Sequence, residues 1–192
     1  GAERSFVSHA HSDHCARHRE ILCTAATARL LRARMPGRRI EHPLPFGQTE
    51  QLTADTTITL HPAGHIFGSA MCLLEHPQHG RLLYTGDFKL HSGLAAEPCA
   101  TPKADVLVME TTFGRPQYVF PPVGEIRDNI VRFCRQAIAD NTTPVLYAYG
   151  LGKSQELLCI LGQAGLPVML HAETHRLTEI CRQLGLALPP YR

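Results

Sequence analysis

The sequence lacks the features by which several protein classes are recognised. No apolar run approaches the roughly 20 residues needed to span a membrane, so we expect no membrane association. The seven cysteines include no CxxC pair, which excludes a cysteine zinc ribbon and a thioredoxin-type motif. Their odd number and irregular spacing favour reduced thiols and a cytoplasmic location. The formal net charge of +2 does not by itself indicate nucleic-acid binding.

The residue pattern predicts a mixed α/β fold. Helical patterns cover residues 25–35, 123–139, 153–163 and 173–184. The second half alternates helix and strand, which is typical of a parallel α/β arrangement. A proline-rich stretch at 114–122 suggests a boundary between a domain at 1–115 and another at 116–192. Short β-branched runs predict strands at 5–8, 21–24, 57–61, 71–75, 82–85, 106–110, 144–149 and 167–171.

Three of the twelve histidines fall in one short stretch near the start of the chain. His9, His11 and His14 are accompanied there by Asp13, in the order His-x-His-x-Asp-His. Because side chains alternate along an extended chain, His9 and His11 would share one side, and Asp13 and His14 on the following turn would form a second pair. One zinc ion takes three or four protein ligands, so these donors suit two neighbouring metal ions. The alternative is a histidine-rich surface loop that binds metal adventitiously.

Further candidate ligands follow predicted strands elsewhere in the chain. His65 lies in a glycine-bounded turn, and His61 ends the strand before it and is the weaker candidate. Asp87 follows Gly86 at the end of an apolar strand, where its two oxygens could bridge two cations or simply serve the turn. Glu110 ends another apolar strand, at the edge where open α/β sheets keep their sites.

In order along the chain, the motifs HxHxDH, AGHxxGSA, TGDFK and a strand ending in ETTFG resemble the metallo-β-lactamase-fold nucleases that carry a β-CASP domain. The wider context, including AYGLGKSQELL and LGLALPPYR, is most similar to the bacterial branch of ligase-associated DNA exonucleases, or mRNA 3′-end-processing-factor-like exonucleases. The resemblance covers essentially the whole chain. It implies a partial metallo-β-lactamase αββα sandwich at 1–115, followed by a partial parallel α/β β-CASP domain at 116–192.

The resemblance also implies two bound zinc ions, with manganese as an alternative metal. Asp13 would be catalytic as well as a ligand, because its carboxylate could orient the attacking water. Glu110 matches the acidic residue of the first β-CASP motif, which positions a proton-donating histidine in the family. The implied ligands are His9, His11 and His65 for one zinc, Asp13 and His14 for the second, and Asp87 bridging both.

Two further histidines of the family belong to later motifs, and the sequence contains neither of those motifs. His171 matches the end of a β-CASP strand instead. The chain also begins almost directly on a strand and ends without a capping element. We therefore expect a fragment of a longer protein, without the first lactamase strands, the last β-CASP motifs and the return to the lactamase domain.

Three residues are candidate substrate contacts. Lys89 stands two residues after Asp87, where it could meet a phosphate. The segment GLGKS resembles a P-loop, but Tyr147 occupies the position of that motif's first glycine, so nucleotide hydrolysis is not expected. Lys153 and Ser154 open a helix there, and the helix N-terminus could still bind a substrate phosphate.

We expect a two-zinc nuclease that hydrolyses phosphodiester bonds, with DNA exonuclease activity favoured because the most similar branch is named for it. An RNA-processing endo- or exoribonuclease is the main alternative, since the catalytic motifs are shared. A small-molecule metallo-hydrolase fits the Glu110 motif less well. A non-catalytic scaffold fits less well because all six expected metal donors are present. The expected partners are nucleic acid and a DNA ligase or helicase.

Overall fold

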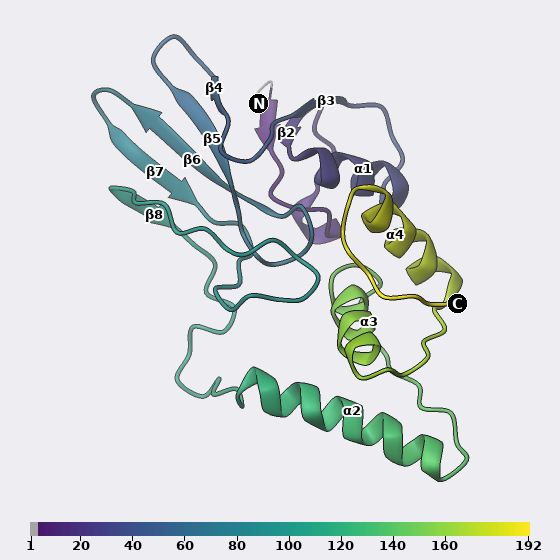
Figure 1. The fold of residues 1–192 in the computed structure, drawn as a ribbon. Helices are drawn as coiled ribbons and strands as arrows, with labels where there is room; N and C mark the ends of the chain where they lie inside the picture. Colours follow the sequence, from purple (N-terminus) through teal and green to yellow (C-terminus); the bar gives the residue numbers. More distant parts are fainter. Residues whose placement is uncertain (1–3) are drawn as a thin grey trace.

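The structure is a computed structural model that describes residues 4–192, and within them it contains two β-sheets and four α-helices (Figure 1). The smaller sheet has three parallel strands, and α1 (Ala25–Arg34) connects the second strand to the third. Its strands in spatial order are β1 (Arg4–Phe6), β2 (Glu20–Cys23) and β3 (Ile40–Pro43).

The larger sheet has five strands that follow one another in chain order. Neighbouring strands are antiparallel, except that β7 and β8 are parallel because the long 85–105 connection returns the chain to the same end. The strands are β4 (Thr49–Gln51), β5 (Thr57–Pro62), β6 (Ala70–His76), β7 (Gly80–Tyr84) and β8 (Val106–Val108).

The two sheets pack face to face through an apolar layer. Alternation along β2 divides its side chains, so that Ile21 and Cys23 face α1 whereas Leu22 faces the larger sheet. Leu60 of β5 is fully buried in this layer. The opposite face of the larger sheet is covered by the 86–105 loop, through residues such as Phe88. The layers are therefore helix, sheet, sheet and loop, and the mixed α/β prediction is confirmed.

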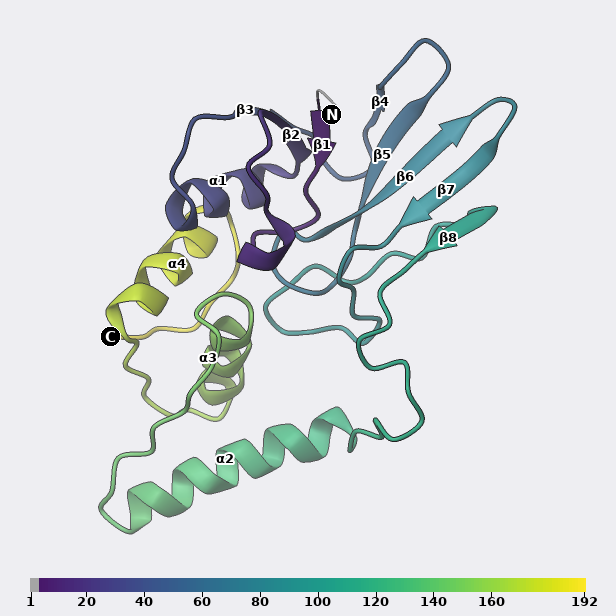
Figure 2. The same cartoon turned by 180° about the vertical axis from the view of Figure 1, so that it is seen from behind.

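The remaining helices belong to the second half of the chain. Helix α4 packs beside α1, whereas α2 runs below α3 and away from both sheets (Figures 1 and 2). Thr24 starts α1 by accepting a hydrogen bond from the backbone N–H of Thr27 at 3.1 Å, and Pro36 follows the end of that helix. The bounds are α2 (Val123–Ala139), α3 (Lys153–Gln163) and α4 (Ala172–Gln183).

The prediction of strands in the second half is wrong. Residues 144–149 and 167–171 belong to no strand, because a strand requires a neighbour along its length. In the second segment, Arg192 donates to the Val168 carbonyl and accepts from the Leu170 N–H, and the His171 carbonyl accepts from His175 in the first turn of α4. Tyr147 and Met169 are 96% and 82% exposed, so the apolar pattern does not reflect burial either. The parallel strand–helix–strand unit lies instead in β2, α1 and β3.

Two further expectations concern domain division and membranes. The proline-rich stretch does separate the sheets from the three later helices, but the domain boundary after residue 115 stays a prediction. Among residues 4–192, no helix combines the length and the apolar content that crossing a bilayer requires.

Candidate metal centre

Three loops at neighbouring strand ends carry the candidate ligands. The segment after β1 runs through His9 and His11 into the short 3₁₀ turn η1 (Ser12–His14), which confirms the predicted turn. The Ser8 carbonyl accepts a hydrogen bond from the Ala70 N–H at 2.8 Å, which holds this segment against the start of β6. The β5–β6 loop carries His65, and the loop after β7 carries Asp87.

Gly86 allows the loop after β7 to approach the histidine segment. Its φ is +53°, in the left-handed region that glycine adopts without steric penalty. A Cβ at this position would lie 2.5 Å from the Ser8 Cβ and 2.7 Å from its Oγ. Only glycine therefore fits, and the close approach brings Asp87 next to the histidines.

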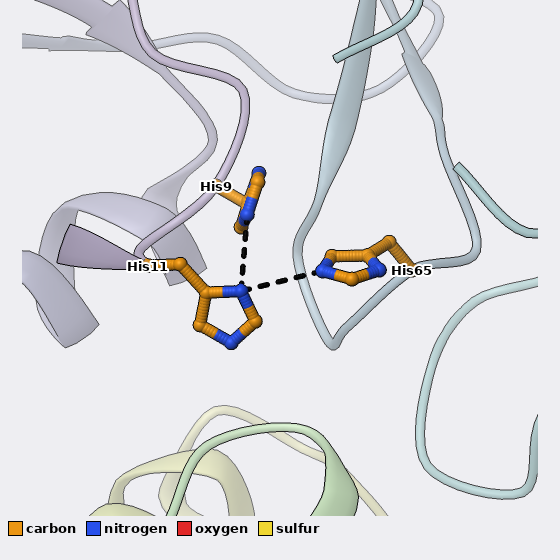
Figure 3. Close-up of side chains that lie close together, drawn as sticks. All are labelled: His9, His11 and His65. Carbon is orange, nitrogen blue, oxygen red and sulfur yellow. Dashed lines mark hydrogen bonds between the residues drawn. The ribbon is translucent and has the colours of Figure 1, made fainter. Parts of the chain in front are cut away.

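His9, His11 and His65 point their ring nitrogens toward one another (Figure 3). The Nδ1 of His11 is 3.1 Å from the Nε2 of His9 and 3.3 Å from the Nε2 of His65. The Nδ1 of His11 can form a hydrogen bond with only one of these two nitrogens at a time, so hydrogen bonding alone does not explain both short distances. Three nitrogens that each lie about 2.0–2.1 Å from one tetrahedral zinc are separated by about 3.3–3.4 Å, so this spacing fits a bound cation.

A second group of metal-binding atoms shares His9 with the first and adds His14 and Asp87. The Oδ1 of Asp87 is 3.3 Å from the Nε2 of His14. Its Oδ2 is 3.6 Å from the Nε2 of His65 and 3.9 Å from that of His9. The two oxygens of Asp87 thus face different histidines. Asp13 lies at the edge, with its Oδ2 3.6 Å from the Nε2 of His14 and its side chain 78% exposed.

Burial favours the neutral imidazole at His9 and at His65. His9 is fully buried, and burial lowers its pKa to about 2, with further lowering by the neighbouring histidines. Burial also lowers the pKa of His65, although Asp87 opposes this shift. The neutral ring has the free lone pair that a metal ligand needs. The buried end of the cluster is therefore prepared for a cation rather than for ion pairs with Asp87.

A cavity of about 570 Å³ opens beside the cluster. Lys89 and Lys153 line it, while their role as substrate contacts stays a prediction. Ser154 does not line it, and its hydroxyl donates to the Tyr149 carbonyl at 2.8 Å. Arg34 lines the cavity and donates to the carbonyl of Ala10, a contact that the sequence did not reveal because Arg34 belongs to a helix with several other arginines.

Other candidates from the sequence lie outside the metal-binding groups. The carboxylate of Glu110 accepts a hydrogen bond from the Phe88 N–H at 3.1 Å and one from the Thr112 hydroxyl at 2.6 Å. Glu110 thus holds the segment directly after Asp87, while its catalytic role stays a prediction. His61 belongs to neither metal-binding group, and His171 accepts from the Glu173 N–H at the start of α4.

Two curated relatives align with nearly all of this chain. A protein named "Probable DNA ligase" from Opitutus terrae is 67% identical over 190 residues, which is 99% of this chain and 19% of the relative. The "5' exonuclease Apollo" of Gallus gallus is 32% identical over 191 residues, covering 94% of this chain and 41% of the relative. These relatives are β-CASP proteins. The chain belongs to the β-CASP family of metallo-β-lactamase-fold nucleases.

Two further comparisons concern a more distant relative and a solved structure. The β-CASP relative "Transcription termination factor FttA" from Methanocaldococcus jannaschii is 27% identical over 191 residues, covering 81% of this chain and 30% of the relative. This chain thus spans between about a fifth and two fifths of the curated relatives named here. No protein-family model matches it. A crystal structure of a protein of unknown function from Enterococcus faecalis V583 shares the fold, with a TM-score of 0.65 and 16% identity over 98% of this chain and 50% of that chain.

Proposed function

We propose that this β-CASP chain is part of a two-zinc nuclease that hydrolyses phosphodiester bonds in DNA. The observation that carries the proposal is the position of Asp87, whose two oxygens face different histidines of two overlapping metal-binding groups. The adjacent cavity supports it, because Lys89 and Lys153 line it and could neutralise a phosphate.

The metal-binding residues fit zinc, with manganese as the alternative metal. His9, His11 and His65 would hold one ion through ring nitrogens, which zinc prefers over carboxylates alone. Asp13 and His14 would hold the second, with Asp87 shared between the two. Two bound cations would supply an activated water and would offset the charge that develops on the phosphate.

Residues around the metals would perform the remaining tasks. The exposed carboxylate of Asp13 faces the cavity and could accept a hydrogen bond from the attacking water. Lys89 and Lys153 would orient the phosphate. Ser154 would not contact it, because its hydroxyl and its backbone N–H both donate to the Tyr149 carbonyl. Glu110 would keep the loop after Asp87 in place, so its effect on catalysis would be indirect.

The larger architecture belongs to the same proposal. The packed sheets of residues 1–115 would form the metallo-β-lactamase part, and residues 116–192 the β-CASP part. A DNA ligase is the favoured partner, because the relative from Opitutus terrae bears that name. Nothing supports the predicted helicase partner. A cytoplasmic location agrees with the seven free cysteines.

The test compares cleavage of end-labelled single-stranded DNA and RNA of one sequence by the full-length protein. Asp87→Asn keeps the size of the side chain but removes its charge, and it should lose metal and cleavage together. Asp55→Asn, at an exposed loop position, is the matched control and should cleave like the wild type. DNA cleavage that depends on metal supports the proposal, and cleavage of RNA alone would reassign the substrate. Absence of cleavage of both by metal-loaded wild type would contradict a nuclease.

A further inference from the structure

His11 contacts the second half of the chain through the ring nitrogen that faces away from the other histidines. Its Nε2 is 3.1 Å from the carbonyl oxygen of Leu151, and in Figure 3 this nitrogen points toward the segment before α3. A carbonyl only accepts hydrogen bonds, so the Nε2 must carry the proton. In a neutral ring the Nδ1 is then left with its lone pair. That nitrogen is the one that faces His9 and His65.

His9 also has a hydrogen-bond partner outside the cluster, but this contact does not determine which ring nitrogen carries the proton. Its Nδ1 is 3.0 Å from the Ser8 hydroxyl, which can either donate or accept. The Leu151 carbonyl is therefore the group that fixes a tautomer in this cluster. The position of the backbone at residue 151 therefore affects the protonation of His11, a candidate metal ligand 140 residues away in the sequence.

Gln155 holds the segment that carries this carbonyl. Its Oε1 accepts from the Gly152 N–H at 2.7 Å, and its Nε2 donates to the Gly150 carbonyl at 3.1 Å. The two bonds bracket Leu151 on both sides. Gly152 has a φ of +91°, and a Cβ there would lie 2.4 Å from the Cγ2 of Ile66, so the segment also packs tightly against the loop that carries His65.

The orientation of the Gln155 amide is itself determined by a buried contact. Gln155 and Thr178 are both buried, and the Gln155 Nε2 lies 2.8 Å from the Thr178 hydroxyl. That hydroxyl donates its single proton to the Thr174 carbonyl at 2.7 Å, so it must accept from Gln155. The amide nitrogen therefore faces Thr178 and Gly150, and the amide oxygen is left for the Gly152 N–H.

We propose that Gln155 is a positioning residue for the metal centre. It fixes residues 150–152 so that the Leu151 carbonyl keeps the proton of His11 on Nε2, which leaves Nδ1 free to bind metal. The inference rests on the proposed metal centre. The alternative is that Gln155 only caps α3, since it occupies the third helical position and bonds to the N-cap backbone.

The test uses the full-length protein with Gln155→Met and the matched control Gln163→Met. Gln155→Met preserves the volume but removes both bonds to residues 150–152. Gln163→Met makes the same change at an exposed position in the same helix and leaves both bonds in place. Two quantities are measured for each protein: the ¹⁵N shifts of the His11 ring without metal, assigned by comparison with His11→Ala, and the zinc affinity by chelator competition.

We expect wild type and Gln163→Met to carry the His11 proton on Nε2 and to bind zinc within about twofold of each other. Gln155→Met should show a mixture of tautomers and a zinc affinity lower by about tenfold or more, in the range for outer ligands of metal sites. Should Gln155→Met not fold, Gln155→Glu replaces it, because it keeps the acceptor for Gly152 but loses the donor to Gly150.

Two results would overturn the inference. One is a His11 proton on Nδ1 in the metal-free wild type. The other is a tautomer and a zinc affinity in the Gln155 variant equal to those of Gln163→Met, which would leave Gln155 as a helix cap only. If the wild type binds no zinc, the proposed function fails, while the His11 ring shifts still decide whether Gln155 sets the tautomer.

Discussion

Replacing Gly86 by alanine should separate Asp87 from the histidines. The new Cβ would lie 2.5 Å from the Ser8 Cβ, whereas carbon atoms in contact prefer about 3.5–4.0 Å, so the loop must move by about 1 Å. Metal sites tolerate misplacement of about 0.5 Å. The left-handed φ of +53° adds about 1–2 kcal/mol for alanine, and overpacking adds about 1–3 kcal/mol. We therefore expect Gly86→Ala to lose about 2–5 kcal/mol of unfolding free energy and to bind less metal.

The assay is urea denaturation of the metal-free full-length protein, followed by metal content after zinc loading and desalting. Gly47→Ala is the matched control, because Gly47 also has a positive φ, of +73°, but a Cβ there meets nothing within 4 Å. It should lose only the backbone part, about 1–2 kcal/mol, and keep its metal. If Gly86→Ala holds as much zinc as Gly47→Ala, the close approach of the two loops does not position Asp87.

Three further predictions test the core, an isolated histidine and the bound metal. Leu60→Ala should lower the unfolding free energy, measured in urea, by about 3–5 kcal/mol, because Leu60 is fully buried between the sheets. A loss below about 1 kcal/mol would contradict that packing. Burial lowers the pKa of His61 below 6.5, so the unfolded chain binds the proton first and stability should fall as the pH drops below about 6.5. Urea midpoints at pH 7.5 and 5.5 should differ less in His61→Gln than in wild type, and equal differences would refute this. Removing zinc with a chelator should lower the melting temperature. The lost stabilisation is about 2.7 kcal/mol if the free zinc concentration was 100 times its Kd. The melting curve of His65→Ala should show no such shift.

The helices were predictable from the sequence because their limits are marked by local chemistry. The predicted and observed bounds of α2 and α3 are identical, and α1 differs by one residue at its end. Glycine or proline flanks each of these helices at one end or both. Such signals act within one turn of helix, so no knowledge of tertiary contacts is needed.

The strands were less predictable because pairing depends on distant residues. β3 ends in Pro43 and β4 is a short polar run, so neither shows an apolar alternation. The opposite error occurred at 144–149 and 167–171, where an apolar pattern exists without a pairing partner. A pattern in one segment records its preference but not the neighbour that completes the ladder.

The candidate site shows the same division. The sequence was sufficient to predict four of the candidate ligands, because metal binding requires particular side chains: His9, His11, His65 and Asp87. The role of the Leu151 carbonyl could not be predicted from the sequence, since any residue at that position supplies a carbonyl. Backbone groups contribute through geometry alone, which depends on the whole fold.

The proposed centre would hold two metal ions at one end of the cavity, on the histidines and Asp87 of the two metal-binding groups. It can be examined by anomalous X-ray scattering at the zinc edge, from crystals of the zinc-loaded full-length protein. We expect two peaks, one about 2.0–2.1 Å from ring nitrogens of His9, His11 and His65 and the other beside His14, with Asp87 between them. A metal-loaded crystal without a peak at His11, or with a single peak elsewhere in the molecule, would show that these residues do not form a two-metal centre.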